Sequence, residues 1–201
     1  MRTKSEAKRQ KILDVAAQVF REEGFERASM AEICARVGGS KATLYSHFPS
    51  KEALFFEVMF LSTEAEFEAT HAALNPDTGD LGDALRHFGR RFITLLTSPE
   101  VMAVRRLIVS ESGRSALGST CYERGPKRSE GIMVAFLEKA VEAGKLRPGN
   151  LRVMTLHLRA LLEAELMDGF LFGIWETPPE GLVDGAVERA VEVFLRAYGQ
   201  P

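Results

Sequence analysis

The sequence predicts an all-α protein of about nine helices, in which an N-terminal three-helix domain (residues 1–50) is joined by a long helix to a larger helical domain (residues 51–201). Apolar residues recur at spacings of three and four, and no stretch alternates as a half-buried strand does. Glycine and proline interrupt this pattern at Gly38-Gly39, Asn75-Pro76 and Arg147-Pro148-Gly149. A chain of 201 residues that is 45% apolar is long enough to bury a sizeable core.

The first two helices have clear end signals. The first is expected over Ser5–Glu23, because its apolar residues share one face and Gly24 is a typical C-terminal breaker. Ser29 is followed three residues later by Glu32, which is the spacing of a capping box. A short second helix is therefore predicted over Met30–Val37.

The third and fourth helices are delimited in the same way. Ser40 is a second N-cap, for a helix over Lys41–Phe48 that Pro49 stops. Ser50 is a third cap and begins a long helix, Lys51–Leu74. Two short, capped helices joined by a tight glycine turn are the helix-turn-helix pattern, whose second helix enters the major groove of DNA.

Five further helices are expected in the rest of the chain, with Gly125-Pro126 kinking or dividing the third of them. The expected segments are 80–97, 99–113, 119–144, 150–174 and 179–198.

Charge is distributed unevenly along the chain. Residues 1–51 hold ten Lys/Arg and six Asp/Glu, a net charge of +4, so the remainder carries −6. A basic N-terminal segment followed by an acidic remainder is expected when one end of a protein binds phosphate groups.

Several function classes find no support in the sequence. It contains no apolar run of the roughly 18 residues that span a bilayer, and its polar N-terminus lacks the apolar core of a signal peptide, so a cytoplasmic protein without membrane contact is expected. Cys34 and Cys121 lack metal-ligand spacing, so neither a metal nor a cofactor is expected. No GxSxG, HExxH, P-loop or GxGxxG motif is present, which argues against an enzyme.

The predicted recognition helix has one apolar and one polar face. Leu44 and Phe48, four residues apart, are expected to pack inward, which leaves Lys41, Ala42, Tyr45 and Ser46 outward. Small side chains permit close approach to base edges, and a lysine can donate to guanine acceptors. The predicted DNA-binding residues, phosphate contacts included, are Ser29, Ser40, Lys41, Ala42, Thr43, Tyr45, Ser46, His47 and Lys51.

The segment ASMAEICARVGGSKATLYSHFPSKEALF resembles the N-terminal domain of the TetR family of bacterial transcriptional regulators, and the match covers residues 8–58. The resemblance implies phosphate contacts at Ser40, Thr43, Tyr45, His47 and Lys51, and groove-facing positions at Lys41, Ala42 and Ser46. This chain departs from the pattern twice. Cys34 stands where alanine is usual, and Gly39 replaces an aliphatic residue of the turn, which removes an apolar anchor.

The larger domain is expected to dimerise, because one helix-turn-helix reads one half-site and a palindromic operator needs two. In TetR proteins the corresponding helices form a four-helix dimer bundle. The candidate dimer stripes, which could instead pack within one subunit, are Leu158, Leu161, Leu162, Leu166 and Phe170, and Val183, Val187, Val191, Phe194 and Leu195.

Aromatic and flexible side chains are dense between the two ends, as in small-molecule pockets of helical bundles. The predicted ligand-binding residues are Phe60, Phe67, Phe88, Phe92, Met102, His157, Met167, Phe170 and Trp175, and the polar groups considered are His71, His87, Glu111, His157 and Glu163. Plain core is the other interpretation of the aromatic residues.

The sequence and the resemblance together predict a sequence-specific transcriptional regulator, a repressor released from its operator by a small hydrophobic ligand. The ligand would favour one arrangement of the helices and move the long helix that follows the recognition helix. The alternative is a ligand-independent corepressor or architectural module with a solid helical core.

Overall fold

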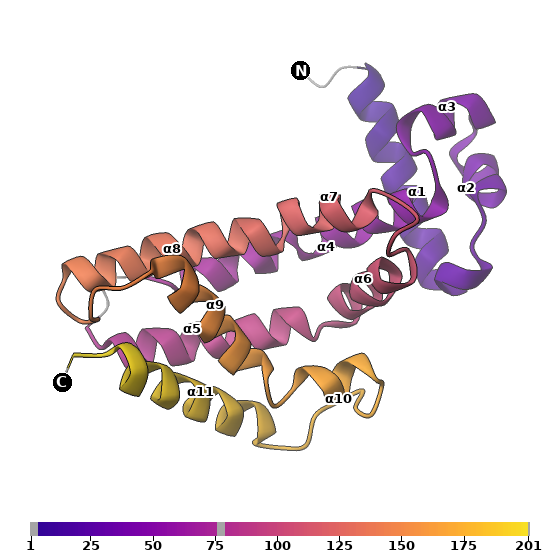
Figure 1. Cartoon of the computed structure of the whole chain (residues 1–201). Helices are drawn as coiled ribbons and strands as arrows, with labels where there is room; N and C mark the ends of the chain where they lie inside the picture. Colours follow the sequence, from indigo (N-terminus) through magenta and orange to yellow (C-terminus); the bar gives the residue numbers. More distant parts are fainter. Residues whose placement is uncertain (1–3, 76–78, 201) are drawn as a thin grey trace. The chain divides into compact units, whose positions relative to one another are not determined.

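The computed structural model describes residues 4–75 and 79–200, which form eleven α-helices and a single antiparallel bridge between Leu146 and Gly199. The predicted all-α fold is confirmed. The helices are α1 (Lys4–Arg27), α2 (Met30–Val37), α3 (Lys41–His47), α4 (Lys51–Ala72), α5 (Leu81–Leu96), α6 (Pro99–Ser110), α7 (Leu117–Arg124), α8 (Pro126–Glu142), α9 (Leu151–Glu163), α10 (Met167–Leu171) and α11 (Leu182–Tyr198) (Figure 1).

Two of the nine expected helical segments are divided in the structure. The segment 119–144 is split into α7 and α8 at Gly125-Pro126, where a break was expected. The segment 150–174 is split into α9 and α10, although the sequence between them contains neither glycine nor proline. The structure therefore has more, shorter helices than the periodicity predicts.

Contacts divide the chain into two compact units, Met1–Glu64 (the N-terminal unit) and Ala65–Pro201 (the C-terminal unit). The division falls inside α4, whereas the sequence suggests a boundary at residue 50. The reason is that the first turns of α4 belong to the N-terminal core. Phe55 lies edge-on to Phe20, with ring centroids 5.1 Å apart, and 4.8 Å from Phe25. The domain limits themselves stay a prediction.

The helix ends follow the capping residues. Ser29 accepts a hydrogen bond from the amide of Glu32, Ser40 from that of Thr43, and Ser50 from that of Ala53. Each bond satisfies an amide of the first helical turn that has no partner within the helix. The break expected at Gly24 is present as a kink, because Gly24 takes the non-helical φ of 76° and a last turn continues to Arg27.

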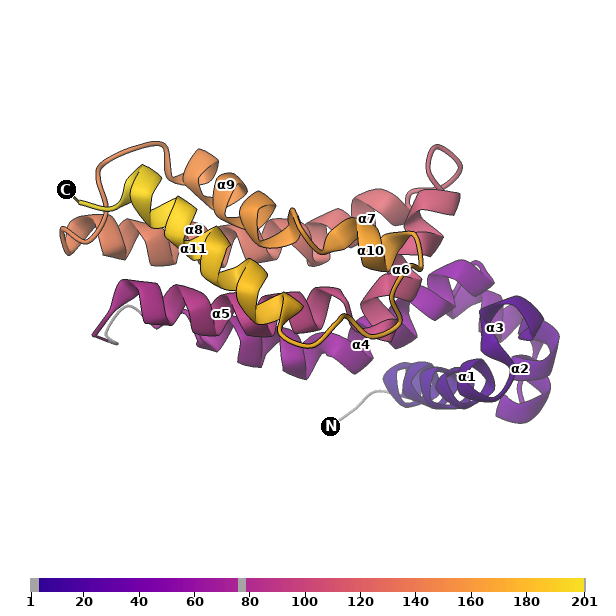
Figure 2. The same cartoon turned by 90° about the horizontal axis from the view of Figure 1, so that it is seen from below.

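The C-terminal unit is a bundle in which α9 and α11 lie side by side, both packing on α5, while α8 packs on α9 (Figures 1 and 2). Gly89 on α5 is what permits this close approach. A Cβ added there would lie 2.8 Å from Leu162 of α9 and 2.9 Å from Val187 of α11.

The apolar stripes of the last two helices form the core of one subunit rather than a free dimer face. Leu158, Leu162, Val187, Val191 and Phe194 are each at most 1% exposed. Their assignment to a dimer interface is therefore wrong, because these side chains already pack against α5 and α8. Among the described helices, none is long and apolar enough to cross a membrane.

Candidate nucleic-acid interface

The turn between α2 and α3 is shaped by Gly38. This residue has φ 68° and ψ 53°, the left-handed conformation that glycine adopts at little cost, and its amide donates to carbonyls at the end of α2. Ser40 then caps α3. Its hydroxyl accepts from the amide of Thr43 and lies 2.9 Å from the Thr43 hydroxyl. Local sequence thus fixes where the second helix of the motif begins.

The inner face of α3 is anchored as the sequence predicts. Leu44 is 3% exposed and Phe48 is 2% exposed. An anchor that the sequence analysis missed is Arg9 of α1, whose guanidinium lies 5.1 Å from the centre of the Phe48 ring. The same guanidinium donates to Glu57 of α4 at 2.6 Å. This cation–π contact and ion pair tie α1 and α4 to the end of α3.

The outer face of α3 carries the predicted DNA-binding side chains. Lys41, Ala42, Tyr45 and Ser46 are exposed, and Tyr45 is 49% exposed. The exposed Tyr45 side chain, with its ring and hydroxyl open to solvent, is available for contact with a macromolecule.

The Thr43 and Ser46 hydroxyls of α3 are already engaged locally. Ser46 donates to the Thr43 carbonyl at 2.8 Å, and the half-buried Thr43 hydroxyl contacts Ser40. His47, also half-buried, lies in the last turn. Ser29 is exposed at the start of α2. The structure thus gathers eight of the nine predicted positions at the exposed starts of α2 and α3 and along α3.

Lys51, the ninth, is held by the protein itself. Its ammonium donates to the carbonyl of Phe25 at 2.8 Å and to that of Glu26 at 3.2 Å, and it lies 4.4 Å from the centre of the Phe25 ring. An ammonium has three donors, so at most one remains for a phosphate. Lys51 therefore has a structural role in joining α4 to the end of α1, while its DNA contact stays a prediction.

The two departures from the TetR pattern contact each other. The Cys34 thiol donates to the Gly39 carbonyl at 3.1 Å, and Cys34 is buried. The chain thus has a polar tie within the turn, where the family pattern would have an aliphatic anchor. This contact could not be read from the sequence, since neither residue type predicts the other.

Arg36 joins α2 to α1 on the surface of the N-terminal unit. It donates to Glu22 and, within α2, to Glu32. The hydrogen bond from Arg36 lowers the pKa of the Glu22 carboxyl, and the bonds to Glu22 and Glu32 raise the pKa of Arg36. With two carboxylates beside it, Arg36 adds little to the positive field that would attract DNA.

In the C-terminal unit, three phenylalanine rings surround one buried polar pair. His71, at the end of α4, is 5% exposed and lies against Phe67, Phe88 and Phe92, with centroid distances of 4.1, 5.7 and 6.5 Å. Its Nδ1 lies 2.8 Å from the Phe67 carbonyl, and its Nε2 lies 2.7 Å from the hydroxyl of Ser129 on α8. We call these five residues the His71 cluster.

The protonation of His71 follows from its partners. A carbonyl only accepts, so the ring proton lies on Nδ1 and Nε2 accepts from Ser129. Burial lowers the pKa of His71 below its ordinary value of 6.5, and the neighbouring Arg128 lowers the pKa further, against the Phe67 carbonyl and Glu68. The imidazole is therefore neutral at pH 7.

The other predicted ligand-binding residues do not join this cluster. Phe60 belongs to the N-terminal unit, beside Phe56. His157 is exposed and contacts the Tyr198 hydroxyl at 2.5 Å. The remaining four candidates lie on or near α6 and α10: Met102 is buried, the Met167 sulfur accepts from Arg105, and Phe170 lies edge-on to Trp175.

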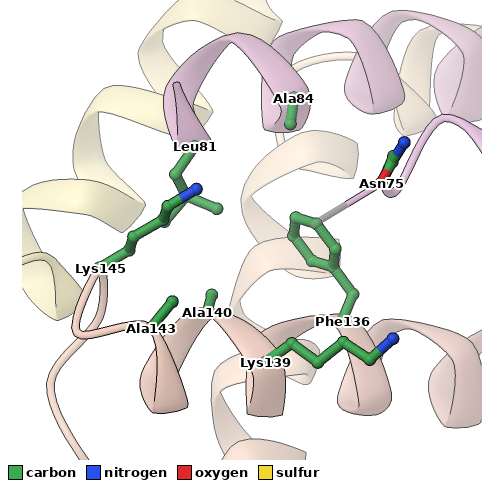
Figure 3. A pocket seen from close by; sticks show the side chains of 8 residues that line it. All are labelled: Asn75, Leu81, Ala84, Phe136, Lys139, Ala140, Ala143 and Lys145. Carbon is green, nitrogen blue, oxygen red and sulfur yellow. The ribbon is translucent and has the colours of Figure 1, made fainter. Parts of the chain in front are cut away.

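A hollow between α5 and α8 lies at a different place in the C-terminal unit. Figure 3 shows the Phe136 ring between the two helices, with Ala84 and Leu81 on the α5 side. Its empty space is about 230 Å³, part of it open to solvent, and it is bordered by Asn75, Leu81, Ala84, Phe136, Lys139, Ala140, Ala143 and Lys145. It contains none of the nine predicted ligand-binding residues.

Two family models match the chain. One, for bacterial regulatory proteins of the tetR family, matches residues 12–58, which include α2 and α3. The other, described as an AefR-like transcriptional repressor, C-terminal domain, matches residues 83–200. The chain belongs to the TetR family. It is therefore a DNA-binding transcriptional regulator, and the matched families are those of regulators rather than enzymes.

Individual TetR-family relatives agree with this assignment. A transcriptional regulator from Mesorhizobium loti has a TM-score of 0.84 and 27% identity, covering 99% of this chain and 100% of its own. The flavonoid-responsive regulator FrrA has a TM-score of 0.72 and 32% identity, covering 96% and 97%. UidR of Escherichia coli is 42% identical over 64 residues, or 32% of this chain, and the match spans only 33% of UidR.

Proposed function

We propose that this TetR-family regulator is a repressor that binds a palindromic operator as a homodimer and is released by a small, planar apolar molecule. The repressor role is supported by the description of the C-terminal family model, an AefR-like transcriptional repressor domain. The exposed face of α3 supports major-groove reading, with Lys41, Ala42 and Ser46 at base edges and Tyr45 among the phosphate contacts.

The dimer would use the outer faces of α9 and α11. Val153 and Leu156 on α9 are 40% and 42% exposed, and Val193 on α11 is 47% exposed. These apolar residues lie on the two helices that pack side by side, away from the buried stripes of the same helices. Two such faces would form a four-helix contact between subunits, related by twofold symmetry.

The observation that carries the ligand proposal is the His71 cluster. Three phenylalanine rings around one histidine–serine pair offer flat apolar surfaces, and the Ser129 oxygen keeps an acceptor site that can orient a ligand hydroxyl. FrrA, which matches this chain over nearly its whole length, is flavonoid-responsive. A hydroxylated, planar aromatic molecule would fit the same chemistry.

The packing of the cluster determines how such a ligand would act. Phe88 is fully buried and Phe92 is 3% exposed, so the rings are in contact with one another rather than around an open cavity. A ligand must therefore separate α4, α5 and α8 to enter. Because α4 begins directly after α3, a displacement of α4 would alter the spacing of the two recognition helices.

One observation favours the alternative, a ligand-independent module with a solid core. The hollow of Figure 3 leaves only about 10 Å³ for the centre of a water-sized molecule, far less than the roughly 300 Å³ or more of a ligand pocket, and it is bordered by other residues. The two functions differ in whether any small molecule shifts the affinity for DNA.

A paired substitution tests the ligand proposal. Flavone and its hydroxylated derivatives are titrated against a fluorescent duplex that the wild-type protein has selected from a random library. We expect release of the duplex, with the midpoint shifted at least about tenfold in Phe92→Leu. Phe136→Leu, a matched buried phenylalanine at the hollow of Figure 3, should leave the midpoint unchanged.

Three other outcomes would decide against parts of this proposal. Equal shifts in both variants would place the ligand outside the His71 cluster. Binding that stabilises the protein without altering DNA affinity would contradict release. If no molecule of the panel changes either the unfolding temperature or DNA affinity, the solid-core alternative is favoured.

A further inference from the structure

Gly39 provides space rather than an unusual backbone conformation. Gly38 needs the left-handed region, with φ 68°, whereas Gly39 is not among the glycines with positive φ. A Cβ added at Gly39 would lie 3.1 Å from Nζ and 3.5 Å from Cε of Lys8. The end of the Lys8 side chain, which comes from α1, thus lies in the space that a side chain at position 39 would fill.

This arrangement places a positive charge beside the first turn of the recognition helix. Gly39 immediately precedes Ser40, the N-cap of α3, whose hydroxyl contacts Thr43. Lys8 is half-buried, and within residues 4–75 and 79–200 no carboxylate lies within ion-pair distance of its ammonium. By contrast the neighbouring Arg9 is neutralised by Glu57.

We propose that Lys8 binds a DNA phosphate next to α3, and that Gly39 is the residue that positions it. The inference rests on the proposed role of α3 as the groove-reading helix. An ammonium is a compact point charge with three donors, which suits a phosphate oxygen. An aliphatic residue at position 39, as in the TetR pattern, would occupy the same space, so this contact distinguishes the present chain from that pattern.

The Cys34–Gly39 contact belongs to the same arrangement. The buried thiol donates to the Gly39 carbonyl and fixes the peptide over which Lys8 lies. The turn therefore gains a polar tie on one side and a lysine on the other, in place of one apolar anchor.

The test is a double-mutant cycle on DNA affinity as a function of salt. The variants are Lys8→Gln, Gly39→Val and the double variant, and the probe is a duplex that the wild-type protein has selected from a random library. We expect Lys8→Gln to lower DNA affinity about three- to tenfold. The salt slope, which is the slope of log affinity against log salt concentration, should fall by the contribution of about one phosphate contact per subunit. Gly39→Val keeps the charge but displaces the side chain, so it should produce a similar loss.

The double variant decides the positioning claim. If Gly39 acts through Lys8, adding Gly39→Val to Lys8→Gln changes affinity by less than about twofold. Independent, multiplicative losses would overturn the role of Gly39, and an unchanged salt slope in Lys8→Gln would overturn the phosphate contact.

Two controls separate this inference from the proposed function and from misfolding. Lys11→Gln removes the same charge from an exposed position one turn along α1, and its smaller effect measures the general field. Tyr45→Phe reports on α3 itself. A loss in Tyr45→Phe with none in Lys8→Gln overturns only the Lys8 contact, whereas no loss in either overturns the α3 interface. Circular dichroism melts of Lys8→Gln should match the wild type.

Discussion

At the scale of single residues, Tyr45 offers the cleanest separation of binding from folding. Its ring is 49% exposed, so its hydroxyl contributes little to the stability of the N-terminal unit. We predict that Tyr45→Phe leaves the unfolding temperature unchanged and weakens DNA binding at least about tenfold, because a hydrogen bond to a charged phosphate is lost. Fluorescence anisotropy should show the same fold loss of affinity on selected and on random duplexes.

Tyr122 supplies the matched control for that substitution. It lies on α7 of the C-terminal unit, is 45% exposed, and is expected to make no DNA contact. Tyr122→Phe should bind both duplexes as the wild type does. A loss confined to the selected duplex in Tyr45→Phe would instead mean that Tyr45 reads a base.

His71 predicts a dependence of stability on pH. Its folded-state pKa lies below the ordinary 6.5, so as the pH falls below about 6.5 the unfolded chain takes up a proton that the folded chain does not. This effect lowers the free energy of unfolding toward acid pH and has no influence at higher pH. Urea unfolding between pH 8 and about pH 5 should show a shallower acid decline for His71→Gln than for the wild type.

The control for this measurement is His87→Gln. His87 is exposed on α5, and its replacement should leave the acid decline in place. Equal acid declines in the wild type and in His71→Gln would show that His71 is not the group that links protonation to unfolding.

At the scale of helices, the ends were predictable where local chemistry sets them. Ser29, Ser40 and Ser50 act as caps because a serine hydroxyl reaches the amide three residues ahead, a relation visible in sequence. The break between α9 and α10 has no such signal. At the other end of α10 the chain folds back so that Trp175 covers Gly169, where an added Cβ would lie 2.2 Å from the indole ring. Periodicity does not encode a tertiary contact of this kind, and no glycine or proline marks the break that precedes α10.

Replacement by alanine should change the stability of the protein in opposite directions at two glycines, one at the end of a helix and one inside a helix. Gly38 ends α2 with φ 68°, so Gly38→Ala should destabilise the protein by about 1 kcal/mol. Gly131 lies inside α8, and a Cβ there would have open space around it. Gly131→Ala should therefore stabilise by about 0.5–1 kcal/mol. Denaturant midpoints of the two variants give the signs, and a stabilising Gly38→Ala would contradict the assigned turn.

At the scale of the whole molecule, the sequence predicted which part of the chain carries the DNA-binding domain better than it predicted which helices pack on one another. The basic N-terminal segment and the helix-turn-helix pattern identify the DNA-binding end, because both are local in sequence. Periodicity shows that a helix has an apolar face but not which partner covers that face. This is why Leu158 and Val187 were assigned to a dimer contact although they pack within one subunit, and why the His71–Ser129 pair, 58 residues apart, was not foreseen.

The dimer prediction follows from what remains exposed once that core is filled. Val153, Leu156 and Val193 are apolar, open to solvent and carried by two adjacent helices. We expect Leu156→Glu combined with Val193→Glu to reduce the solution mass from twice the 22.3 kDa chain mass to that of one chain, because two buried carboxylates per subunit would lack partners. Light scattering after size exclusion measures this directly.

Operator binding should be lost with the dimer, since a single helix-turn-helix contacts only one half-site. Val109→Glu is the control, because Val109 is 67% exposed but lies on α6, outside the proposed face. It should leave mass and DNA affinity unchanged. A dimeric double variant would place the subunit contact elsewhere, whereas a monomer that still bound the operator at wild-type affinity would remove the need for two linked recognition helices.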